Sequence, residues 1–260
     1  MDANIQFSRI FSDRDMVLAT DLDGTFLGGS TQAREALYSW VEGNRDRIAL
    51  VFVTGRDPGF IAELCADNAV PAPDFVIGDV GTTIARFEQG RLDPIAVLEA
   101  PIVRRWHGKP ELVRTRLAGI RGLWLQPTSF RHRLSYQYDD RFDPASLHVL
   151  EGVDVDILIS HGCFVDILPQ GISKGPSLQS LIAYLKLPAT RVLVAGDTMN
   201  DFSMFQTGLR GAVVGGAEPE LLEATQHLPH AYRCRAAGAG GILEAIRAHA
   251  LFPSIPEVHE

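Results

Sequence analysis

The chain has no long apolar run and no secretory leader. None of its segments approaches the about 18 consecutive apolar residues that a membrane-spanning helix requires. Residues 1–4 also lack the basic start and the apolar stretch of a signal peptide. These absences predict a soluble, cytoplasmic protein without a membrane partner.

Cysteine and positive charge are both scarce. The three cysteines, Cys65, Cys163 and Cys234, are odd in number and lack metal-site spacing, which favours buried thiols. The 24 basic side chains are outnumbered by 32 acidic ones, so the formal net charge is −8. This balance argues against non-specific binding to nucleic acid or to an anionic membrane. A phosphorylated ligand would therefore need positive groups close to it.

The rest of the composition is that of an ordinary globular protein, with 46% hydrophobic and 22% charged residues. A chain of 260 residues can form one large domain or two modest ones with a substantial core. The sequence contains no internal repeat and no low-complexity linker. We expect a monomer or a weak homo-oligomer.

Residues 18–27 carry the strongest chemical signal. A short apolar run ends at Asp21-Leu22-Asp23-Gly24, so two carboxylates follow a buried strand. Alternate residues of an extended segment point the same way, which predicts that Asp21 and Asp23 lie close together and raise each other's pKa unless a cation compensates them. Gly24 permits a tight turn that brings N–H groups to an anion. The pattern suits a carboxylate nucleophile, a second carboxylate, a metal and a phosphate, although an ordinary acidic turn explains it equally well.

The chain before residue 78 alternates strands and helices. Apolar strands are predicted at 48–53 and 74–77, and helices at 31–41, with Thr31 as the N-cap, and at about 58–68. The strand at 48–53 ends at Thr54-Gly55-Arg56. This alternation predicts a parallel sheet with right-handed crossovers, and such sheets place their sites at the carboxyl ends of the strands.

From residue 78 to residue 169 the pattern becomes antiparallel. A hairpin is expected over 81–91, helices near 109–120 and 144–150, and strands near 123–125, 132–138, 155–159 and 163–168. The parallel pattern resumes with a helix at 174–185, strands at 191–195, 211–215 and 230–234, and helices after residue 200, at 220–224 and at 241–251. We therefore predict a discontinuous core domain, residues 1–80 plus 170–260, with a smaller α+β domain of residues 81–169 inserted into it.

Four motifs stand in order at the strand ends of the predicted core. They are Asp21-Leu22-Asp23-Gly24-Thr25, Thr54-Gly55-Arg56, Lys174-Gly175 and Gly196-Asp197-Thr198-Met199-Asn200-Asp201. In these motifs the sequence resembles the haloacid dehalogenase superfamily of phosphohydrolases. The resemblance covers nearly the whole chain and implies a Rossmann-like α/β core with an α+β cap inserted between the second and third motifs.

Shorter stretches resemble the sucrose-phosphate phosphatase branch, which includes mannosylfructose-phosphate phosphatases. They are residues 78–82, 125–127, 133–135, 165–170 and 215–217. The sequence departs from the branch at Phe164, where an acidic residue is usual, and at Arg133, where Lys is frequent.

The resemblance implies a magnesium-dependent phosphoric monoester hydrolase that works through an aspartyl-phosphate. Asp21 would be the nucleophile, and Asp23 the general acid and base. The carboxylates of Asp21 and Asp197 and the backbone carbonyl of Asp23 would hold Mg²⁺, with Asp201 acting indirectly or through a bound water. The phosphoryl oxygens would be held by Gly24, Thr54, Gly55, Lys174 and Asn200, of which Thr54 and Lys174 also count as catalytic.

Six residues of the predicted cap are candidates for binding the sugar. They are Gly81, Thr82, Gln126, Arg131, Arg133 and Asp166. An ordinary structural or surface role explains each of these residues at least as well. Similarly, Thr54 could simply end a strand, and Asn200 and Asp201 could cap a helix.

The predicted function is release of phosphate from a small phosphorylated sugar, with a disaccharide phosphate such as sucrose-phosphate or mannosylfructose-phosphate favoured. A phosphatase of broad specificity for small phosphorylated metabolites is one alternative, and a phosphotransferase that uses the same aspartyl-phosphate is another. From a different class, the chain could be a catalytically silent sugar-phosphate sensor. The pair Asp21 and Asp23 argues against a sensor, because a pure binding module has no use for two adjacent carboxylates beside a phosphate.

Overall fold

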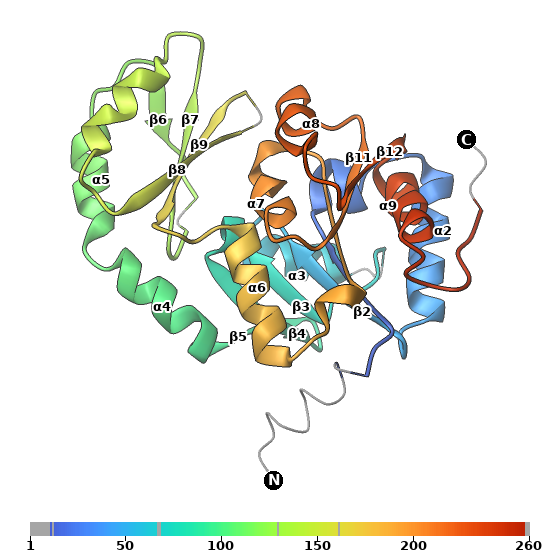
Figure 1. Ribbon diagram of the computed structural model, residues 1–260. Coiled ribbons are helices and arrows are strands. Elements are labelled where there is room, and N and C mark those ends of the chain that lie inside the picture. The colour runs from blue at the N-terminus through green and yellow to red at the C-terminus, as the bar shows by residue number, and fades with distance from the viewer. Residues whose placement is uncertain (1–10, 12, 67–68, 129, 161, 258–260) are drawn as a thin grey trace.

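The computed structural model describes residues 11, 13–66, 69–128, 130–160 and 162–257. Figure 1 shows a larger unit built on a long sheet and, at the left, a smaller unit built on strands β6 to β9. The helices and strands of the smaller unit lie between Lys109 and Pro169, so this unit interrupts the larger one in the chain. Among the described helices, none is long and apolar enough to cross a membrane.

The larger unit contains an eight-stranded sheet with the order β12-β11-β10-β1-β2-β3-β4-β5. Neighbours from β12 to β3 are parallel, whereas β4 and β5 are antiparallel additions at one edge. The strands are β1 (Met16–Thr20), β2 (Ile48–Val53), β3 (Phe75–Gly78), β4 (Thr83–Glu88), β5 (Arg91–Pro94), β10 (Val192–Gly196), β11 (Arg210–Gly215) and β12 (Ala231–Ala237). The carboxyl ends of β10, β1 and β2 are therefore adjacent.

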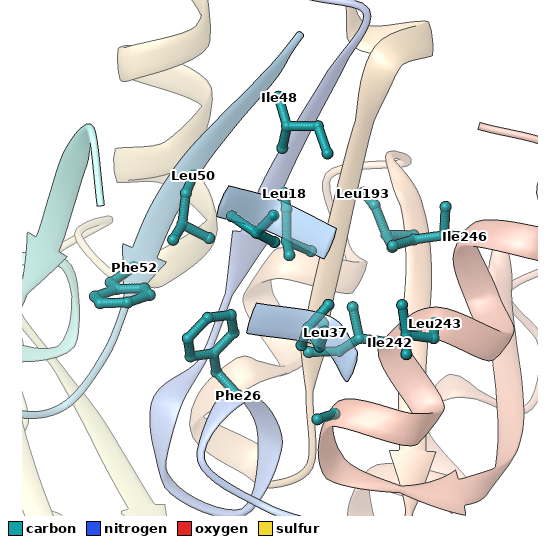
Figure 2. Close-up of a cluster of buried hydrophobic side chains, with 14 of the residues drawn as sticks. Leu18, Phe26, Leu37, Ile48, Leu50, Phe52, Leu193, Ile242, Leu243 and Ile246 are labelled. Atoms are coloured by element: carbon teal, nitrogen blue, oxygen red, sulfur yellow. The ribbon is translucent and has the colours of Figure 1, made fainter. Parts of the chain in front are cut away.

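Helices cover both faces of this sheet, which explains why its central strands are apolar throughout. One face packs on α2 (Thr31–Gly43), α3 (Pro58–Ala66) and α9 (Gly238–Ala248), and the other on α6 (Lys174–Leu185), α7 (Phe202–Phe205) and α8 (Pro219–Thr225). Figure 2 shows Leu18 of β1 among side chains of α2 and α9, whereas Val17 and Ala19 join the opposite cluster. Burying each such large apolar side chain stabilises the fold by roughly 1.5–3 kcal/mol.

The smaller unit is a four-stranded antiparallel sheet with the order β6-β7-β9-β8. Its strands are β6 (Leu123–Leu125), β7 (Leu134–Tyr138), β8 (Val155–Ser160) and β9 (Phe164–Pro169). Helix α5 (Lys109–Leu117) and the 3₁₀ turn η3 (Pro144–Leu150) pack on one face around Tyr136, Val165 and Ile167. Since side chains alternate along a strand, Ser135 and Asp166, which are directly opposite each other, share the other face.

The predicted fold class is confirmed, a parallel-dominated α/β sheet with an inserted α+β unit. One helix was not predicted, α4 (Ala96–Trp106), which contains Pro101 and leads from the larger sheet to the smaller unit. The N-cap of α2 is Ser30 and not Thr31, because the Ser30 hydroxyl is the group that accepts a hydrogen bond from the Ala33 N–H. Residues 67–68, at the end of the second predicted helix, lie outside the described residues.

The expected hairpin exists, and its two strands, β4 and β5, extend the larger sheet. The division of the chain at residues 80/81 and 169/170 stays a prediction.

Candidate active site

Three adjacent strands end in the polar residues that the motifs predicted. Asp21 follows β1, Thr54 follows β2 and Asp197 follows β10. The Asp21 N–H donates to the carbonyl of Ala195 at 2.9 Å, which fixes the first of these ends against β10. The chain then turns at Gly24, whose φ of +78° is a conformation that residues with a Cβ rarely adopt. The parallel topology thus brings motifs separated by more than a hundred residues to one edge of the sheet.

Lys174 is at the centre of this edge and is fully buried. Its Nζ donates to Asp21 Oδ1 at 2.7 Å, to Asn200 Oδ1 at 2.6 Å and to Asp201 Oδ1 at 2.6 Å. Burial opposes its charge, but the carboxylates of Asp201 and Asp21 prevail and raise the pKa of Lys174. All three ammonium protons are therefore used. Lys174 thus connects Asp21 of the first sequence motif with Asn200 and Asp201 of the last.

Three carboxylates, those of Asp21, Asp197 and Asp201, lie close enough together to hold one metal ion. Burial raises the pKa of Asp21 well above its ordinary value; Lys174 opposes the shift, and Asp201 and Asp197 add to it. Burial likewise raises the pKa of Asp197 to about 7, assisted by Asp201 and opposed by Thr25 and Lys174. The sequence led us to expect that Asp23 raises the pKa of Asp21; the carboxylates that raise it prominently are instead Asp201 and Asp197.

This donor set fits a magnesium ion, because it offers only oxygen and carries more negative charge than Lys174 can balance. Asp197 Oδ1 accepts from Thr25 Oγ1 at 2.8 Å, which orients the carboxylate. Both oxygens of Asp201 are already engaged, one by Lys174 and the other by the N–H groups of Asp197 and Thr198. Asp21 and Asp197 are thus better placed as direct ligands than Asp201.

Asp23 is held by a different cation. Its carboxylate accepts from Arg56 Nε at 2.8 Å and from Arg56 Nη2 at 3.0 Å. The Arg56 guanidinium also stacks on the Phe60 ring, 4.5 Å from its centroid. Both side chains are about half exposed, so this pair can rearrange at low cost. Asp21 and Asp23 face one cavity, as expected, but each has its own positively charged partner.

The loop after β2 holds Thr54 rigidly. Its N–H donates to the carbonyl of Ile77 at 2.8 Å and its carbonyl accepts from Val80 at 3.1 Å. The Thr54 hydroxyl oxygen accepts from the Arg56 N–H at 3.1 Å. With that oxygen engaged, the hydroxyl proton is left to donate elsewhere. Thr54 is fully buried.

A cavity of about 360 Å³ lies between the sheet edge of the larger unit and the open face of the smaller unit. This volume is typical of pockets for small molecules, which span about 300–1,000 Å³. It is lined from the larger unit by Asp21, Asp23, Gly55, Arg56, Asp57, Val80 and Asn200, and from the smaller unit by Gln126, Thr128, Phe130, Arg133, Ser160, Phe164 and Asp166. The cavity therefore has one end rich in carboxylates and another that mixes polar and aromatic groups.

The six residues predicted to bind sugar divide into two groups. Gln126, Arg133 and Asp166 line the cavity. Gly81, Thr82 and Arg131 are not in its lining. The carbonyl of Gly81 accepts from Ser177 Oγ of α6, and the guanidinium of Arg131 donates to Glu99 of α4 at 2.7 Å. Their contacts are thus those of structural residues, although their assignment to the sugar stays a prediction.

Several lining residues were not singled out from the sequence. Arg56 stands inside the quoted motif Thr54-Gly55-Arg56, so its position was a usable signal. Phe130 and Ser160 reach the cavity only because the smaller unit turns its open face toward the larger one, and no local pattern marks them.

Comparison with known proteins agrees with this geometry. The family description "Sucrose-6F-phosphate phosphohydrolase" matches residues 14–250. A glucosylglycerol-phosphate synthase of Pseudomonas anguilliseptica is 39% identical over 234 residues, which is 88% of this chain but 30% of that protein. The chain thus spans less than a third of that relative. A mannosylfructose-phosphate phosphatase of Agrobacterium fabrum is 30% identical over 246 residues, covering 91% of this chain and 98% of that one.

Solved structures show the same arrangement of units. The sucrose-phosphatase of Synechocystis sp. PCC6803, solved in complex with sucrose and phosphate, superposes with a TM-score of 0.82 at 30% identity. The match covers 91% of this chain and 98% of that one. Both units of the present fold are therefore included in the similarity.

Proposed function

Because the chain belongs to the sucrose-6F-phosphate phosphohydrolase family, whose fold is that of the haloacid dehalogenase phosphatases, we propose that it is a magnesium-dependent phosphatase of a glycosylated sugar phosphate. The observation that carries the proposal is the position of Lys174. Its ammonium holds Asp21 at 2.7 Å on one side and Asp201 at 2.6 Å on the other, beside a cavity that also contains Asp23. The proposed nucleophile and the proposed proton-transfer group would thus act close to one fixed positive charge.

In the first step an oxygen of Asp21 attacks the phosphorus atom, and the bond between phosphorus and the ester oxygen breaks. The product is an aspartyl-phosphate and the free sugar. Lys174 keeps one Asp21 oxygen in place at 2.7 Å, which orients the carboxylate for the attack. Phosphate monoesters are extremely inert in water, and covalent catalysis divides the hydrolysis into two easier displacements.

Asp23 supplies the proton that the departing sugar oxygen needs. Its carboxylate must first part from Arg56, which occupies both of its oxygens in this structure, and take up a proton from solvent that it then passes to that oxygen. In the second step the ionised Asp23 takes a proton from a water molecule, which attacks phosphorus and releases Asp21 and inorganic phosphate. The same group thus works as acid and then as base.

Charge on the transferred phosphoryl group is stabilised by the residues around it. Mg²⁺, when bound, would neutralise phosphoryl oxygens, and the carboxylates of Asp21 and Asp197 with the Asp23 carbonyl would hold it. The Thr54 hydroxyl and the Gly55 N–H donate to the phosphoryl oxygens. Lys174 contributes a fixed positive charge that needs no reorganisation during the reaction.

The smaller unit is proposed to be the cap that recognises the sugar. Its open face supplies half of the cavity lining, including Gln126, Phe164 and Asp166. The polar groups suit sugar hydroxyls, and an aromatic ring suits the apolar face of a pyranose. A disaccharide phosphate, sucrose-phosphate or mannosylfructose-phosphate, is the first candidate, since the phosphatases of this family to which the chain is similar carry these names.

A second candidate is glucosylglycerol phosphate. The relative with 39% identity is named for the synthesis of this compound, whereas the sucrose- and mannosylfructose-phosphate phosphatases are 28–31% identical. The higher identity covers 88% of the present chain, including both units. A substrate with one sugar ring and a glycerol phosphate also needs fewer polar partners than a disaccharide.

The test is phosphate release from a panel of compounds with and without Mg²⁺. The panel contains sucrose-phosphate, mannosylfructose-phosphate, glucosylglycerol phosphate, trehalose phosphate, glucose and fructose phosphates and a nucleotide. Asp21→Asn, which keeps the size of the side chain and removes the nucleophile, is the control. We expect one glycoside phosphate to exceed the monosaccharide phosphates by orders of magnitude in kcat/KM, with the variant inactive.

Other outcomes would select the alternatives. Comparable weak turnover of the whole panel would leave a broad phosphatase and remove the glycoside assignment. If wild-type protein and Asp21→Asn bind sugar phosphates equally well and neither releases phosphate with Mg²⁺ present, the protein is a sensor and the proposal fails.

A further inference from the structure

Arg133 connects the two units through a single guanidinium. It belongs to the smaller unit, next to β7, and is only 5% exposed. Its Nη1 donates to Asp166 Oδ1 at 2.8 Å within the smaller unit, and its Nη2 donates to the Gly55 carbonyl of the larger unit at 2.7 Å. A charge buried this deeply is tolerated only with such partners. The Phe130 ring, whose centroid is 3.7 Å from Arg133 Cζ, lies against the guanidinium.

An acidic group of the larger unit faces the same guanidinium nitrogen as the Gly55 carbonyl. Asp79 Oδ1 lies 3.9 Å from Arg133 Nη2, and Asp79 is 1% exposed. Asp79 and Val80 have φ angles of +52° and +56°, which are strained for residues with a Cβ. The segment that follows β3 is thus held in an unfavourable backbone conformation next to the Arg133 guanidinium.

The Gly55 carbonyl belongs to the peptide unit whose N–H is that of Arg56. This N–H donates to the Thr54 hydroxyl oxygen at 3.1 Å. One peptide plane therefore joins Arg133, at its carbonyl, to Thr54, at its N–H. A hydrogen bond to the carbonyl of an amide polarises the amide and strengthens the bond that its N–H donates. Because the Thr54 oxygen is the acceptor, its proton is available for a phosphoryl oxygen.

We propose that Arg133 is a positioning residue that makes phosphate binding by Thr54 depend on closure of the smaller unit over the larger one. This inference rests on the function proposed above. When the units are together, Arg133 fixes the peptide between residues 55 and 56 and, through it, the Thr54 hydroxyl. When they separate, Arg133 keeps Asp166 but loses the Gly55 carbonyl, and the peptide loses the partner that fixes its plane.

The test measures binding of inorganic phosphate by calorimetry at saturating Mg²⁺, with no sugar present. Arg133→Lys keeps the charge beside Asp166, but its ammonium cannot reach two partners in the fixed geometry of a guanidinium. We expect this variant to bind phosphate about tenfold more weakly, the loss of roughly one charge-assisted hydrogen bond. Arg141→Lys is the matched control, since Arg141 pairs with Asp139 within the smaller unit and is exposed.

A double-mutant cycle with Thr54→Val separates positioning from a merely structural role. If Arg133 acts through Thr54, then Arg133→Lys weakens phosphate binding less than about twofold in the Thr54→Val background. Equal losses in both backgrounds would show that Arg133 acts independently of Thr54 and would overturn the inference. An unchanged phosphate affinity in Arg133→Lys alone would overturn it as well.

Arg133→Gln combined with Asp166→Asn is a second variant, in which both members of the buried pair lose their charge together. It is compared with Asp166→Asn alone, and the same tenfold difference is expected. If wild-type protein binds no phosphate, the proposed function fails and this inference fails with it. If wild-type protein binds phosphate and neither Arg133 variant differs from its reference, only this inference fails.

Discussion

The Arg56 guanidinium holds the Asp23 carboxylate at both oxygens, with Nε 2.8 Å from Oδ2 and Nη2 3.0 Å from Oδ1. Neither oxygen is then free to give a proton to a leaving group. The pair is about half exposed, and Arg56 rests on the Phe60 ring, so the guanidinium can move aside when a substrate oxygen arrives. Arg56 thus orients Asp23 before the reaction without being a permanent partner.

Removal of the proton-transfer group should matter most for a poor leaving group. We expect Asp23→Asn to lower kcat for a sugar phosphate by about 10²- to 10⁴-fold, the usual contribution of general acid catalysis. With p-nitrophenyl phosphate, whose leaving group needs little protonation, Asp23→Asn should lower the rate of the first step much less. Rates for both substrates, measured in wild type, Asp23→Asn and Arg56→Ala, test this. Arg56→Ala should show the same dependence on the leaving group to a lesser degree, and equal losses on both substrates would contradict the role of Asp23.

Loss of the buried ammonium should destabilise the protein as well as inactivate it. In Lys174→Met the carboxylates of Asp21 and Asp201 remain buried without their shared cation. The expected cost is about 3–5 kcal/mol in the free energy of unfolding, measured by urea denaturation. Lys109→Met is the control, since Lys109 pairs with Asp154, a carboxylate that is 76% exposed. The expected cost of Lys109→Met is below about 1 kcal/mol. Equal losses of stability in the two variants would show that the buried ammonium of Lys174 is not needed to stabilise Asp21 and Asp201.

Magnesium binding should weaken as the pH falls through 7. Burial, with Asp201 next, raises the pKa of Asp197 to about 7, so below that pH a proton competes with the metal for this carboxylate. Without metal, lowering the pH has the opposite effect and stabilises the folded protein. The folded protein then carries the cost of an ionised buried Asp197 at pH 8, and this cost falls away as the pH drops through 7 toward the unfolded pKa near 4.

The measurement is Tm with Mg²⁺ and with a chelator at pH 6 and pH 8. We expect the increase in Tm caused by Mg²⁺ to be larger at pH 8, and Asp197→Asn to abolish most of the difference. An increase that is the same at both pH values would show that Asp197 does not titrate in this range.

A methyl group at Gly24 should disrupt the metal site. A Cβ at this position would lie 2.1 Å from Asp197 Oδ2, and the φ of +78° adds backbone strain. Gly119→Ala is the matched control, since Gly119 has a φ of +80° with open space around the added carbon. Both variants should lose about 1–2 kcal/mol of stability from the backbone. Only Gly24→Ala should also lose Mg²⁺ affinity in a calorimetric titration, and equal affinities would contradict the assignment of Asp197 as a ligand.

The sequence was sufficient to predict the sheet edge of this site, because short motifs and strand ends determine it. Asp21, Thr54 and Asp197 each follow an apolar strand, and the parallel topology necessarily brings such positions together. The three partners of Lys174 also come from the predicted motifs. The family resemblance is confirmed by the match over residues 14–250.

The side of the cavity formed by the smaller unit was harder to predict. Arg133 and Arg131 are two residues apart, yet one donates to Gly55 of the larger unit and the other to Glu99 of α4. Their different environments depend on how the smaller unit is placed, which local sequence does not encode. Helix α4 was missed because Pro101 stands inside it, a residue that normally ends a helix.

The stereochemical course at phosphorus reveals whether Asp21 forms a covalent bond to the phosphorus atom. A thiophosphate ester made chiral with oxygen isotopes is hydrolysed in water of a third isotope, and the configuration of the released thiophosphate is determined. Attack by Asp21 followed by attack of water gives two inversions, so we expect overall retention. Overall inversion would mean that water attacks the substrate phosphorus in a single step, and it would contradict the role of Asp21 as the nucleophile.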